Sequence, residues 1–480
     1  MQLIPEIRTK RFLQKGSCRQ TRGSEGKTVF RKKPFSATRI LAYGFLVSIL
    51  CGTFLLMLPA ASAPGVETRF IDALFTAASA VCVTGLVTVP TFSQWSFFGQ
   101  FIILLLVQTG GLCIIAFTIL FFLIMGKRTG LKERLLLQAA YNVGTMSGIT
   151  TMARHIFTGA FVVEGCGALL VMPRFVKDFG PRGVWVSIFH AVSAFCNAGM
   201  DIIGPDSLAP YAGDVWINLV TSALIILGGI GFPIWWIILG RLKDRLSMKE
   251  RPAKAPYPGL YLKTVLLMTG GLLLAGTAAV LLLEYSNPET LAPLSFGKKL
   301  LAAFFQSVTL RTAGFYTISQ KGLRNSTCMI ACILMFIGGS PSGTAGGIKT
   351  TTFLIIAFTV LSMLKEKDFT EFLHRKISEN TVRRALAIFM ASLTAAVVSM
   401  TLLTAVCPGD FLDCLYEVVS AVGTVGLSRG LTENLNTAGK AVIIGTMFLG
   451  RIGRVSLSKF FNTSRFQNLI VCAEEPLSVG

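Results

Sequence analysis

Long apolar segments recur along this chain of 480 residues, and short polar or basic stretches separate them. The segments 97–125 and 260–283 contain no acidic or basic residue apart from Lys263. A helix of about 20 apolar residues crosses roughly 30 Å of hydrocarbon. A soluble fold would have to bury such helices on every side. The pattern therefore predicts an all-α membrane protein that crosses the bilayer many times.

A short segment that ends in glycine occurs four times at an almost constant spacing. Its glycines are Gly85, Gly199, Gly314 and Gly426, and the intervals between them are 114, 115 and 112 residues. An aromatic residue stands ten positions before each glycine, and a serine stands six positions before three of them, whereas the third segment has Val308 there. Because a chance motif would not keep this period, we predict four copies of one structural unit.

Each copy has similar surroundings. Apolar helices are expected before the glycine segments, at 38–60, 151–172, 260–283 and 384–406, and after them, at 98–124, 215–240, 327–363 and 437–460. The glycine segment itself, of about 10–15 residues, is too short to span the bilayer and predicts a re-entrant loop. The expected fold is four helix–pore loop–helix repeats, with eight transmembrane helices around a pseudo-fourfold pore, as in a potassium channel. The predicted divisions are a basic N-terminus at 1–37, repeats at 38–126, 151–241, 260–364 and 384–460, and a C-terminal tail at 461–480.

The four re-entrant loops predict a selectivity filter for a monovalent cation. Non-helical backbone at membrane depth is tolerated where it is buried in protein or lines a water-filled cavity. Rings of backbone carbonyls can replace the hydration shell of an ion, and glycine allows the backbone conformations that this requires. The expected filter residues are Cys82, Val83, Thr84, Gly85, Cys196, Asn197, Ala198, Gly199, Arg311, Thr312, Ala313, Gly314, Gly423, Thr424, Val425 and Gly426.

The distribution of charge along the chain predicts its orientation in the membrane. Only 14% of the residues are charged, yet the formal net charge is +21, and eleven Lys or Arg fall within residues 1–39. The loops 126–135 and 241–254, which join repeats, are also basic, whereas 201–214 carries three aspartates. The positive-inside rule then places both termini in the cytosol of a multi-pass protein of the cell membrane, with the N-terminus near anionic lipids. Nucleic acid is not an expected partner, because no aromatic platform accompanies the charge.

A glycine-rich interruption in the third repeat predicts a gate. The run 338–349 places five glycines and a proline inside what should be one helix. Interior glycine and proline cost a helix about 1 and 3 kcal/mol. We interpret the run as a broken helix whose middle occludes the pore below the filter, with a simple kink as the alternative. The expected gate residues are Gly338, Gly339, Ser340, Pro341, Ser342, Gly343, Thr344, Ala345, Gly346, Gly347, Lys349 and Arg451.

Arg451 and Arg311 leave alternatives open. Arg451, at the matching depth of the fourth repeat, is interpreted as a positive barrier, the alternative being an arginine that snorkels at the cytosolic edge. Arg311 lies beside the filter, so we expect its guanidinium to turn back behind the filter to a carbonyl or carboxylate, the alternative being that it caps a pore helix. Glu164, alone in an apolar helix, either pairs with a polar neighbour or lines a crevice.

At these motifs the sequence resembles the Trk/Ktr/HKT superfamily of potassium transporters. The resemblance rests on Ala80–Leu86, Asn197–Asp201, Arg311–Phe315 and Thr424–Ser428, and Gly338–Thr352 resembles specifically the Ktr-type membrane subunit. It implies potassium uptake, with sodium as a candidate activator, by a homodimer on a cytosolic ring of nucleotide-binding, RCK-type regulatory subunits. It implies no cofactor in this chain. Arg454 stands where the family usually has proline.

Three other functions compete with this reading. A secondary transporter with inverted repeats would have alternating topology and midplane carboxylates, but these repeats share one orientation. A membrane enzyme would need a catalytic constellation or metal cluster, and three dispersed His supply neither, so the chain is not expected to be an enzyme. A sodium-conducting relative is the nearest alternative. The resemblance associates serine at the first filter position with sodium, and Gly85 stands there.

Overall fold

The structure is a computed structural model that describes residues 37–112, 149–246 and 259–460. The basic N-terminus up to residue 36, the loop 126–135, part of the second basic loop and the tail 461–480 lie outside the described residues. Four helices precede the glycine segments: α1 (Ala37–Leu56), α7 (Ile149–Phe179), α11 (Gly259–Glu284) and α15 (Glu379–Val406). All four contain apolar stretches long enough to cross a membrane, because each places at least 18 residues in an apolar run.

Four short helices lead into the glycines: α2 (Phe70–Cys82), α8 (Arg182–Cys196), α12 (Phe296–Thr309) and α16 (Phe411–Gly423). At 13 to 15 residues they are too short to span the bilayer. Their small and aromatic residues let their C-terminal halves pack closely against the surrounding helices, and Phe75, Phe189 and Tyr416 are 0% exposed. The short helices therefore lie mostly inside the protein, while all four long helices carry exposed apolar side chains.

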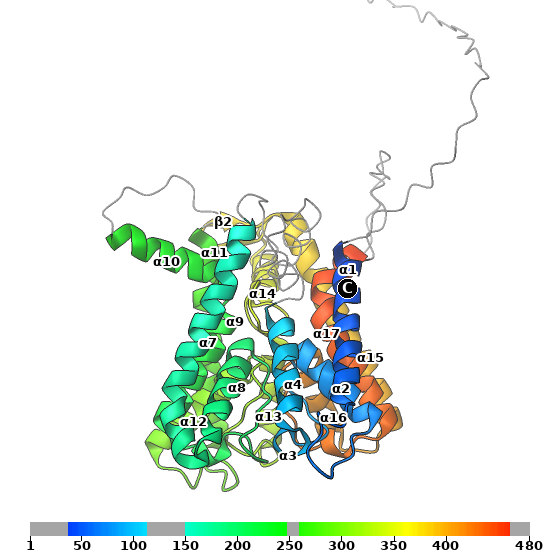
Figure 1. Cartoon of the computed structure of the whole chain (residues 1–480). Helices are drawn as coiled ribbons and strands as arrows, with labels where there is room; N and C mark the ends of the chain where they lie inside the picture. Colours follow the sequence, from blue (N-terminus) through cyan, green and yellow to red (C-terminus); the bar gives the residue numbers. More distant parts are fainter. Residues whose placement is uncertain (1–36, 113–148, 247–258, 461–480) are drawn as a thin grey trace, which may run out of the picture. The chain divides into compact units, whose positions relative to one another are not determined.

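A second set of helices follows the glycines: α4 (Phe97–Gly111), α9 (Val215–Gly229), α13 (Asn325–Phe336) and α17 (Thr437–Phe460). Each contacts the short helix of the next repeat: α4 packs on α8, α9 on α12, α13 on α16, and α17 on α2 (Figure 1). The last of these contacts joins the fourth repeat to the first. The repeats therefore close into a ring.

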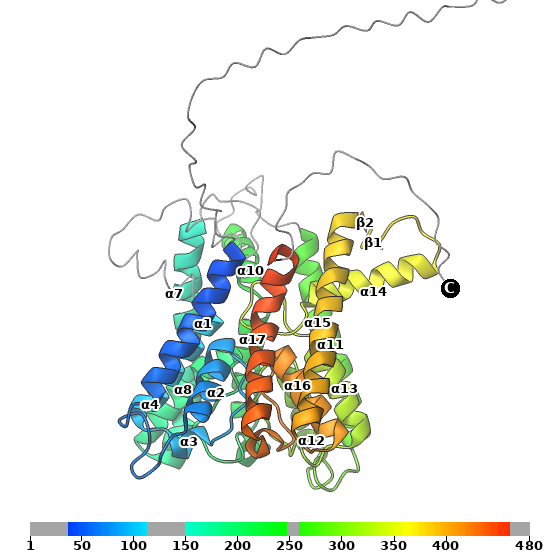
Figure 2. The same cartoon turned by 90° about the vertical axis from the view of Figure 1, so that its right-hand side faces the viewer.

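Within the described residues, two of the second helices are interrupted; the part of the expected helix 98–124 beyond residue 112 lies outside them. The continuous helix expected at 215–240 is wrong, because α10 (Phe232–Leu246) turns 97° away from α9 (Figure 1). The turn follows from Gly231, at φ +97°, a conformation that a Cβ disfavours, and from the Pro233 that succeeds it. In the third repeat, α13 ends at Phe336 and α14 (Thr350–Leu364) does not continue its line (Figure 2).

The remaining elements are small. They are the helix α3 (Thr91–Gln94), the 3-10 turns η1 (Ala209–Tyr211) and η2 (Thr432–Asn434), and the strands β1 (Glu371–Phe372) and β2 (Arg375–Lys376). The strands form an antiparallel hairpin in which Glu371 faces Lys376 and Phe372 faces Arg375. This hairpin lies between α14 and α15 and is the one departure from an all-helical fold among the described residues.

Candidate functional site

The four glycine loops, defined as 82–85, 196–199, 311–314 and 423–426, meet in a closed ring. A Cβ on Gly199 would lie 2.5 Å from the Ala313 oxygen, and one on Gly314 would lie 2.7 Å from the Val425 oxygen. A Cβ on Gly426 would overlap the carbonyl oxygen of Thr84, and one on Gly85 that of Ala198. Each glycine therefore faces the carbonyl that precedes the glycine of the next repeat. Nothing larger than hydrogen fits at these four positions.

The glycine loops share one unusual backbone conformation. The residue two positions before each glycine is left-handed: φ is +56° at Val83, +59° at Asn197, +71° at Thr312 and +51° at Thr424. The glycines themselves have φ between +67° and +95°. Non-glycine residues rarely adopt positive φ. Its recurrence at the same place in four repeats shows that the tertiary structure imposes it, and such conformations concentrate at functional sites.

Hydroxyl groups of the short helices hold the glycine loops. Gly85 N donates to Ser79 Oγ at 3.0 Å, and Gly426 N donates to Ser420 Oγ at 3.1 Å. Ser193 Oγ donates to the Met200 oxygen at 2.6 Å, just beyond the second loop. These are the serines that recur six positions before the glycine. Their recurrence reflects support of the loop rather than contact with a ligand.

The third glycine loop has the same kind of support, but the turn that joins it to its short helix is one residue shorter. Its short helix ends with a bond from Ala313 N to the Thr309 oxygen, four residues back, whereas Thr84 N reaches five residues back to Ser79. Thr309 Oγ1 consequently takes the serine's role by donating to the Phe315 oxygen. The buried aromatic is Phe305, at 0% exposed, in place of Phe304. The aromatic residue ten positions before Gly314, Phe304, is therefore not the equivalent of the other three, and the position is wrong by one residue.

Glycines of the second helices pack directly behind the loops. A Cβ on Gly110 would overlap the Val81 oxygen, one on Gly228 the Phe195 oxygen, and one on Gly450 would lie 2.5 Å from the Val422 oxygen. Each of these carbonyls lies four residues before a loop glycine. The third repeat has no equivalent contact among the described residues, because loop 337–349 replaces its helix at this depth.

Loop 337–349 lies against three of the glycine loops. Thr344 Oγ1 lies 2.7 Å from Asn197 Oδ1 and 3.1 Å from the Phe195 oxygen, and Gly346 N donates to Thr312 Oγ1 at 3.0 Å. A Cβ on Gly346 would overlap Thr424 Oγ1 of the fourth loop. The side chains of Asn197 and Thr312 thus turn to loop 337–349 and leave the ring to the backbone.

Further bonds fix the shape of loop 337–349. Gly338 N donates to the Ile348 oxygen at 2.9 Å, and Gly339 N donates to the Gly346 oxygen at 3.1 Å. Ser340 N bonds the Gly229 oxygen at the end of α9, and Phe232 N bonds the Ser342 oxygen. Pro341, Gly343, Ala345 and Gly347 complete the loop, and Lys349 Nζ bonds the Ala345 oxygen at 2.8 Å. The loop therefore bridges the break in the second repeat.

Arg451 reaches this loop from α17. Its Nη1 donates to the Thr344 oxygen at 2.8 Å, and its Nη2 donates to the Gly110 oxygen at 2.7 Å. Arginine offers five fixed donors and no acceptor, so it suits backbone carbonyls that no helix satisfies. Arg451 therefore joins the fourth repeat, the first repeat and the loop of the third. The alternative of a snorkelling anchor does not describe these contacts.

Two other buried charges behave differently from each other. Glu164 is 4% exposed, and both of its carboxylate oxygens accept from Gln108 Nε2 at 3.0 Å, while Cys196 Sγ lies 3.8 Å from Oε1. Glu164 therefore pairs with polar neighbours, which was the first of its two alternatives. Arg311 is 8% exposed, and within the described residues its guanidinium has neither a carboxylate nor a carbonyl partner. The expectation that it turns back to such a group is wrong.

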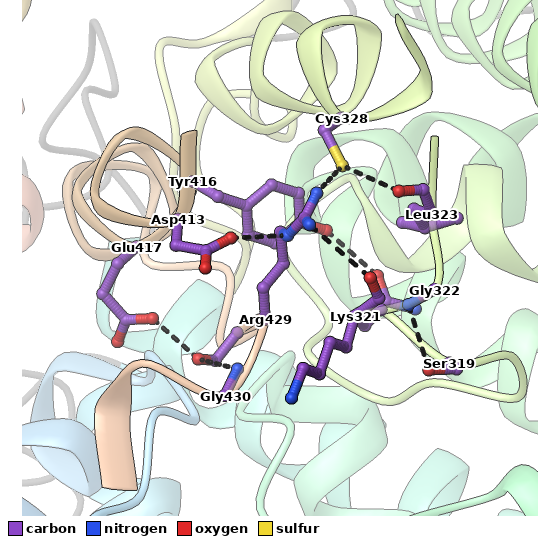
Figure 3. A network of polar contacts seen from close by, with 12 residues as sticks. Ser319, Lys321, Gly322, Leu323, Cys328, Asp413, Tyr416, Glu417, Arg429 and Gly430 are labelled. Atoms are coloured by element: carbon purple, nitrogen blue, oxygen red, sulfur yellow. Dashed lines mark hydrogen bonds and ion pairs between the residues drawn. The ribbon is translucent and has the colours of Figure 1, made fainter. Parts of the chain in front are cut away.

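A polar network holds the segment that follows the fourth glycine loop. Arg429 lies between Asp413 and Cys328 (Figure 3), with Nε 2.8 Å from Asp413 Oδ1 and Nη1 2.6 Å from Cys328 Sγ. Glu417 accepts from Ser428 Oγ at 2.7 Å and from Thr432 Oγ1. Sequence reasoning missed these residues. The signal was available, because Glu417 and Asp413 are carboxylates in an otherwise apolar short helix.

Carboxylates also lie on the side of the ring away from loop 337–349. Asp201 follows the second glycine loop, and its Oδ1 accepts from Ile203 N at 3.4 Å. Burial raises the pKa of Asp201 to about 6, although the hydrogen bond from Ile203 lowers it. Burial, together with the charges of Asp201, Asp206 and Glu433, raises the pKa of the Tyr316 hydroxyl to about 12. This mouth of the ring is therefore acidic.

Two basic residues on this side of the protein, Arg174 and Lys440, are paired with carboxylates. Arg174 lies 3.0 Å from Asp214 Oδ2 and 3.7 Å from Asp178 Oδ2. Lys440 of α17 lies 2.6 Å from Asp72 Oδ1 of α2, which also accepts from Thr88 Oγ1 at 2.8 Å. The lysine pair ties the fourth repeat to the first. Both arginine and lysine charges are thus compensated locally.

This chain is similar to known proteins in sequence and in fold. The chain is 41% identical over 438 residues to Ktr system potassium uptake protein B of Bacillus subtilis, covering 91% of this chain and 95% of that protein. It is 40% identical to the potassium/sodium uptake protein NtpJ of Enterococcus hirae, covering 94% and 98%. The crystal structure of the potassium transporter TrkH from Vibrio parahaemolyticus shares the fold, with a TM-score of 0.71 at 18% identity over 91% of this chain and 87% of that one.

The match to a family covers the whole of the described structure. The model of the family TrkH, described as cation transport protein, matches residues 31–467, which include all four glycine loops and loop 337–349. The all-helical, multi-pass fold with four repeats is the fold of this family. The chain belongs to the TrkH family of cation transport proteins.

Proposed function

We propose that this chain is the ion-translocating subunit of a Ktr-type potassium uptake system. The observation that carries the proposal is the closed ring of four glycine loops, one from each repeat, in which every glycine faces a backbone carbonyl of the next loop. Carbonyl rings of this kind can replace the water around a dehydrated ion. The relatives from Bacillus subtilis and Enterococcus hirae, both named for potassium uptake, support potassium as the ion.

Loop 337–349 and Arg451 are proposed as the gate. The loop lies against the glycine loops of three repeats, and Arg451 bonds its Thr344 carbonyl. An arginine held there places positive charge beneath a cation filter and so opposes ion entry. Movement of α14, which begins directly after the loop, would move the loop away from the ring.

The finer assignments rest on the same family. The residues 82–85, 196–199, 311–314 and 423–426 are proposed as the filter, within repeats bounded at 38–126, 151–241, 260–364 and 384–460. We propose a homodimer in the cell membrane with both termini cytosolic, on a ring of nucleotide-binding, RCK-type regulatory subunits. Lipids would contact the exposed apolar side chains of the long helices. Sodium is proposed as an activator.

Sodium conduction is the second candidate function. It is favoured by the name of the Enterococcus hirae relative, which includes sodium as well as potassium. The test is flux into liposomes that contain the purified chain, measured separately with potassium, rubidium and sodium. We expect uptake of potassium and rubidium and little of sodium. Equal fluxes of all three ions would reject a potassium filter, and sodium uptake alone would support the second candidate.

A further inference from the structure

The buried aromatic residue of the fourth short helix is a tyrosine, Tyr416, whereas the other three short helices have phenylalanine at the equivalent position. Tyr416 is 0% exposed. A tyrosine hydroxyl usually has a hydrogen-bond partner when it is buried. Tyr416 has its partner in another repeat, because its hydroxyl donates to Gln320 Oε1 at 3.0 Å. Gln320 lies six residues after Gly314, in the segment that follows the third glycine loop.

Gln320 is also bonded to the third short helix. Gln306 of α12 donates from Nε2 to Gln320 Oε1 at 2.8 Å, and Gln320 donates from Nε2 to Gln306 Oε1 at 3.1 Å. Gln320 Nε2 also donates to the Ile318 oxygen at 2.9 Å. Gln306 is 0% exposed and Gln320 is 4% exposed, so these bonds are shielded from water. We call Tyr416, Gln306 and Gln320 the inter-repeat brace.

The inter-repeat brace holds the third glycine loop from both sides. Gln306 lies eight residues before Gly314 and Gln320 lies six residues after it, so the amide pair joins the two ends of this part of the chain. Tyr416 connects the pair to α16, which leads into the fourth loop. The two loops also meet in the ring, since a Cβ on Gly314 would lie 2.7 Å from the Val425 oxygen. Because a fully bonded buried network rigidifies its surroundings, the brace fixes the third loop relative to the fourth.

We propose that the inter-repeat brace sets the spacing of the third and fourth glycine loops and so contributes to the selection of potassium over sodium. Its members are positioning residues, because they act through the loops and not on the ion. The inference rests on the proposed filter, since the spacing of these loops affects selection only if their carbonyls bind the ion. Sodium is the smaller ion, and a ring whose carbonyls can approach one another accommodates it better. Loss of the brace should therefore favour sodium.

Tyr416→Phe tests the brace through the loss of one hydroxyl, and it gives the fourth short helix the ring that the other three already have. In competitive uptake into liposomes, the preference for potassium over sodium should fall about fivefold, which corresponds to about 1 kcal/mol, the net contribution of one hydrogen bond. Gln320→Met removes the acceptor that Tyr416 and Gln306 share, and it should lower the preference at least as far. Adding Tyr416→Phe to Gln320→Met should change the preference no further, because the hydroxyl has already lost its partner.

The matched control is Tyr211→Phe, which also removes a buried and bonded tyrosine hydroxyl. Tyr211 is 5% exposed, and its hydroxyl donates to Asp178 Oδ2 at 2.7 Å, in a contact between η1 and α7 of the second repeat. Tyr211→Phe and Tyr416→Phe should both lower the thermal unfolding midpoint in detergent, but Tyr211→Phe should leave the ion preference unchanged. The ion preference therefore separates positioning of the loops from a general loss of stability.

A loss of preference in Tyr416→Phe that is absent from Tyr211→Phe supports the proposal. If the unmodified protein prefers potassium, an unchanged preference in Tyr416→Phe, or an equal loss in Tyr211→Phe, would overturn the brace and leave the filter in place. An unmodified protein without that preference would reject the proposed filter, and this inference with it.

Discussion

Arg451 and Thr344, 107 residues apart in the chain, are joined by a hydrogen bond of 2.8 Å from Nη1 to the backbone oxygen. Thr344 in turn bonds Asn197 of the second glycine loop through its hydroxyl. A guanidinium on α17 is therefore connected through one residue of loop 337–349 to the ring. This connection is the structural basis for treating the loop and the arginine as one unit.

Substitutions of Arg451 should raise potassium flux in liposomes. Arg451→Gln keeps hydrogen-bond donors but removes the charge, so we expect a modest increase, of about two- to fivefold if it removes roughly 0.5–1 kcal/mol of barrier. Arg451→Ala also loses the bonds to Thr344 and Gly110 and should raise flux further. Deleting Ser340–Thr344 removes the carbonyl that Arg451 bonds, and it should likewise raise flux and weaken control by regulatory subunits.

The double variant decides whether these changes act on one gate. Arg451→Ala combined with the Ser340–Thr344 deletion should add little to either change alone, because contacting sites are non-additive. Fully additive increases would show that Arg451 acts elsewhere. Flux below that of the unmodified protein in a correctly assembled deletion variant would instead favour a structural kink.

Gly85→Ser should reduce the preference for potassium over sodium. The new Cβ would overlap the Ala198 carbonyl oxygen, and φ at Gly85 is +95°, so the ring must shift. We expect at least a tenfold loss of selectivity, equivalent to about 1.4 kcal/mol, in competitive flux measurements. Gly270→Ser in α11 is the control, because a Cβ there meets no atom within 4 Å. Unchanged selectivity with serine at each of the four loop glycines would remove the filter assignment.

The periodic features were predictable from sequence, and the family match confirms the predicted family and all-helical repeat fold. The spacing of glycines and the serines before them identified the units because each signal is local. The bend after Gly229 was missed, although the Gly231 and Pro233 that cause it are local signals too. The one-residue shift at Thr309 was missed because the third segment has hydroxyl residues at both 307 and 309. The sequence does not show which of the two supports the loop.

Contacts between distant segments could not be predicted in the same way. The bond from Thr344 to Asn197 joins residues 147 positions apart. The surroundings of Arg311 depend on how helices α9 and α11 pack beside it. A single sequence contains the residue types but not the pairing. Glu164 is an example, since the sequence left two alternatives for it, and only the fold, in which α7 and α4 both pack on α8, placed Gln108 beside it.

Loss of the Glu164 carboxyl should destabilise the fold more than loss of its charge. Glu164→Ala leaves the Gln108 amide buried without its acceptor, which costs about 1–3 kcal/mol in addition to the cavity. Glu164→Gln keeps an acceptor at the same place and should cost less. Thermal unfolding in detergent measures the order. The control is Glu379→Ala, whose side chain is 77% exposed and forms an exposed pair with Arg383, so it should change little. Equal midpoints for the Ala and Gln variants of Glu164 would contradict this role.

Potassium uptake should depend on pH through Asp201. Because its pKa is raised to about 6, this carboxylate is ionised at pH 7.5 and mostly neutral at pH 5.5. Loss of one negative charge at the mouth of the ring lowers the local cation concentration. The potassium concentration for half-maximal uptake should therefore rise by about two- to fivefold on acidification, given that a unit charge nearby contributes on the order of 1 kcal/mol.

Asp201→Asn isolates this effect. The variant should match the acidified protein at both pH values, whereas Asp214→Asn should retain the pH dependence, because Asp214 already pairs with Arg174 at 3.0 Å. Stability gives a second readout. The folded pKa exceeds the ordinary value of 3.8, so the ionised form is disfavoured in the fold, and stability from this group is present at low pH and lost as pH rises through 6. Asp201→Asn should consequently unfold at a higher temperature than the unmodified protein at pH 7.5 and at the same temperature near pH 4. An unfolding midpoint that the substitution leaves unchanged at pH 7.5 would show that Asp201 does not titrate in this way.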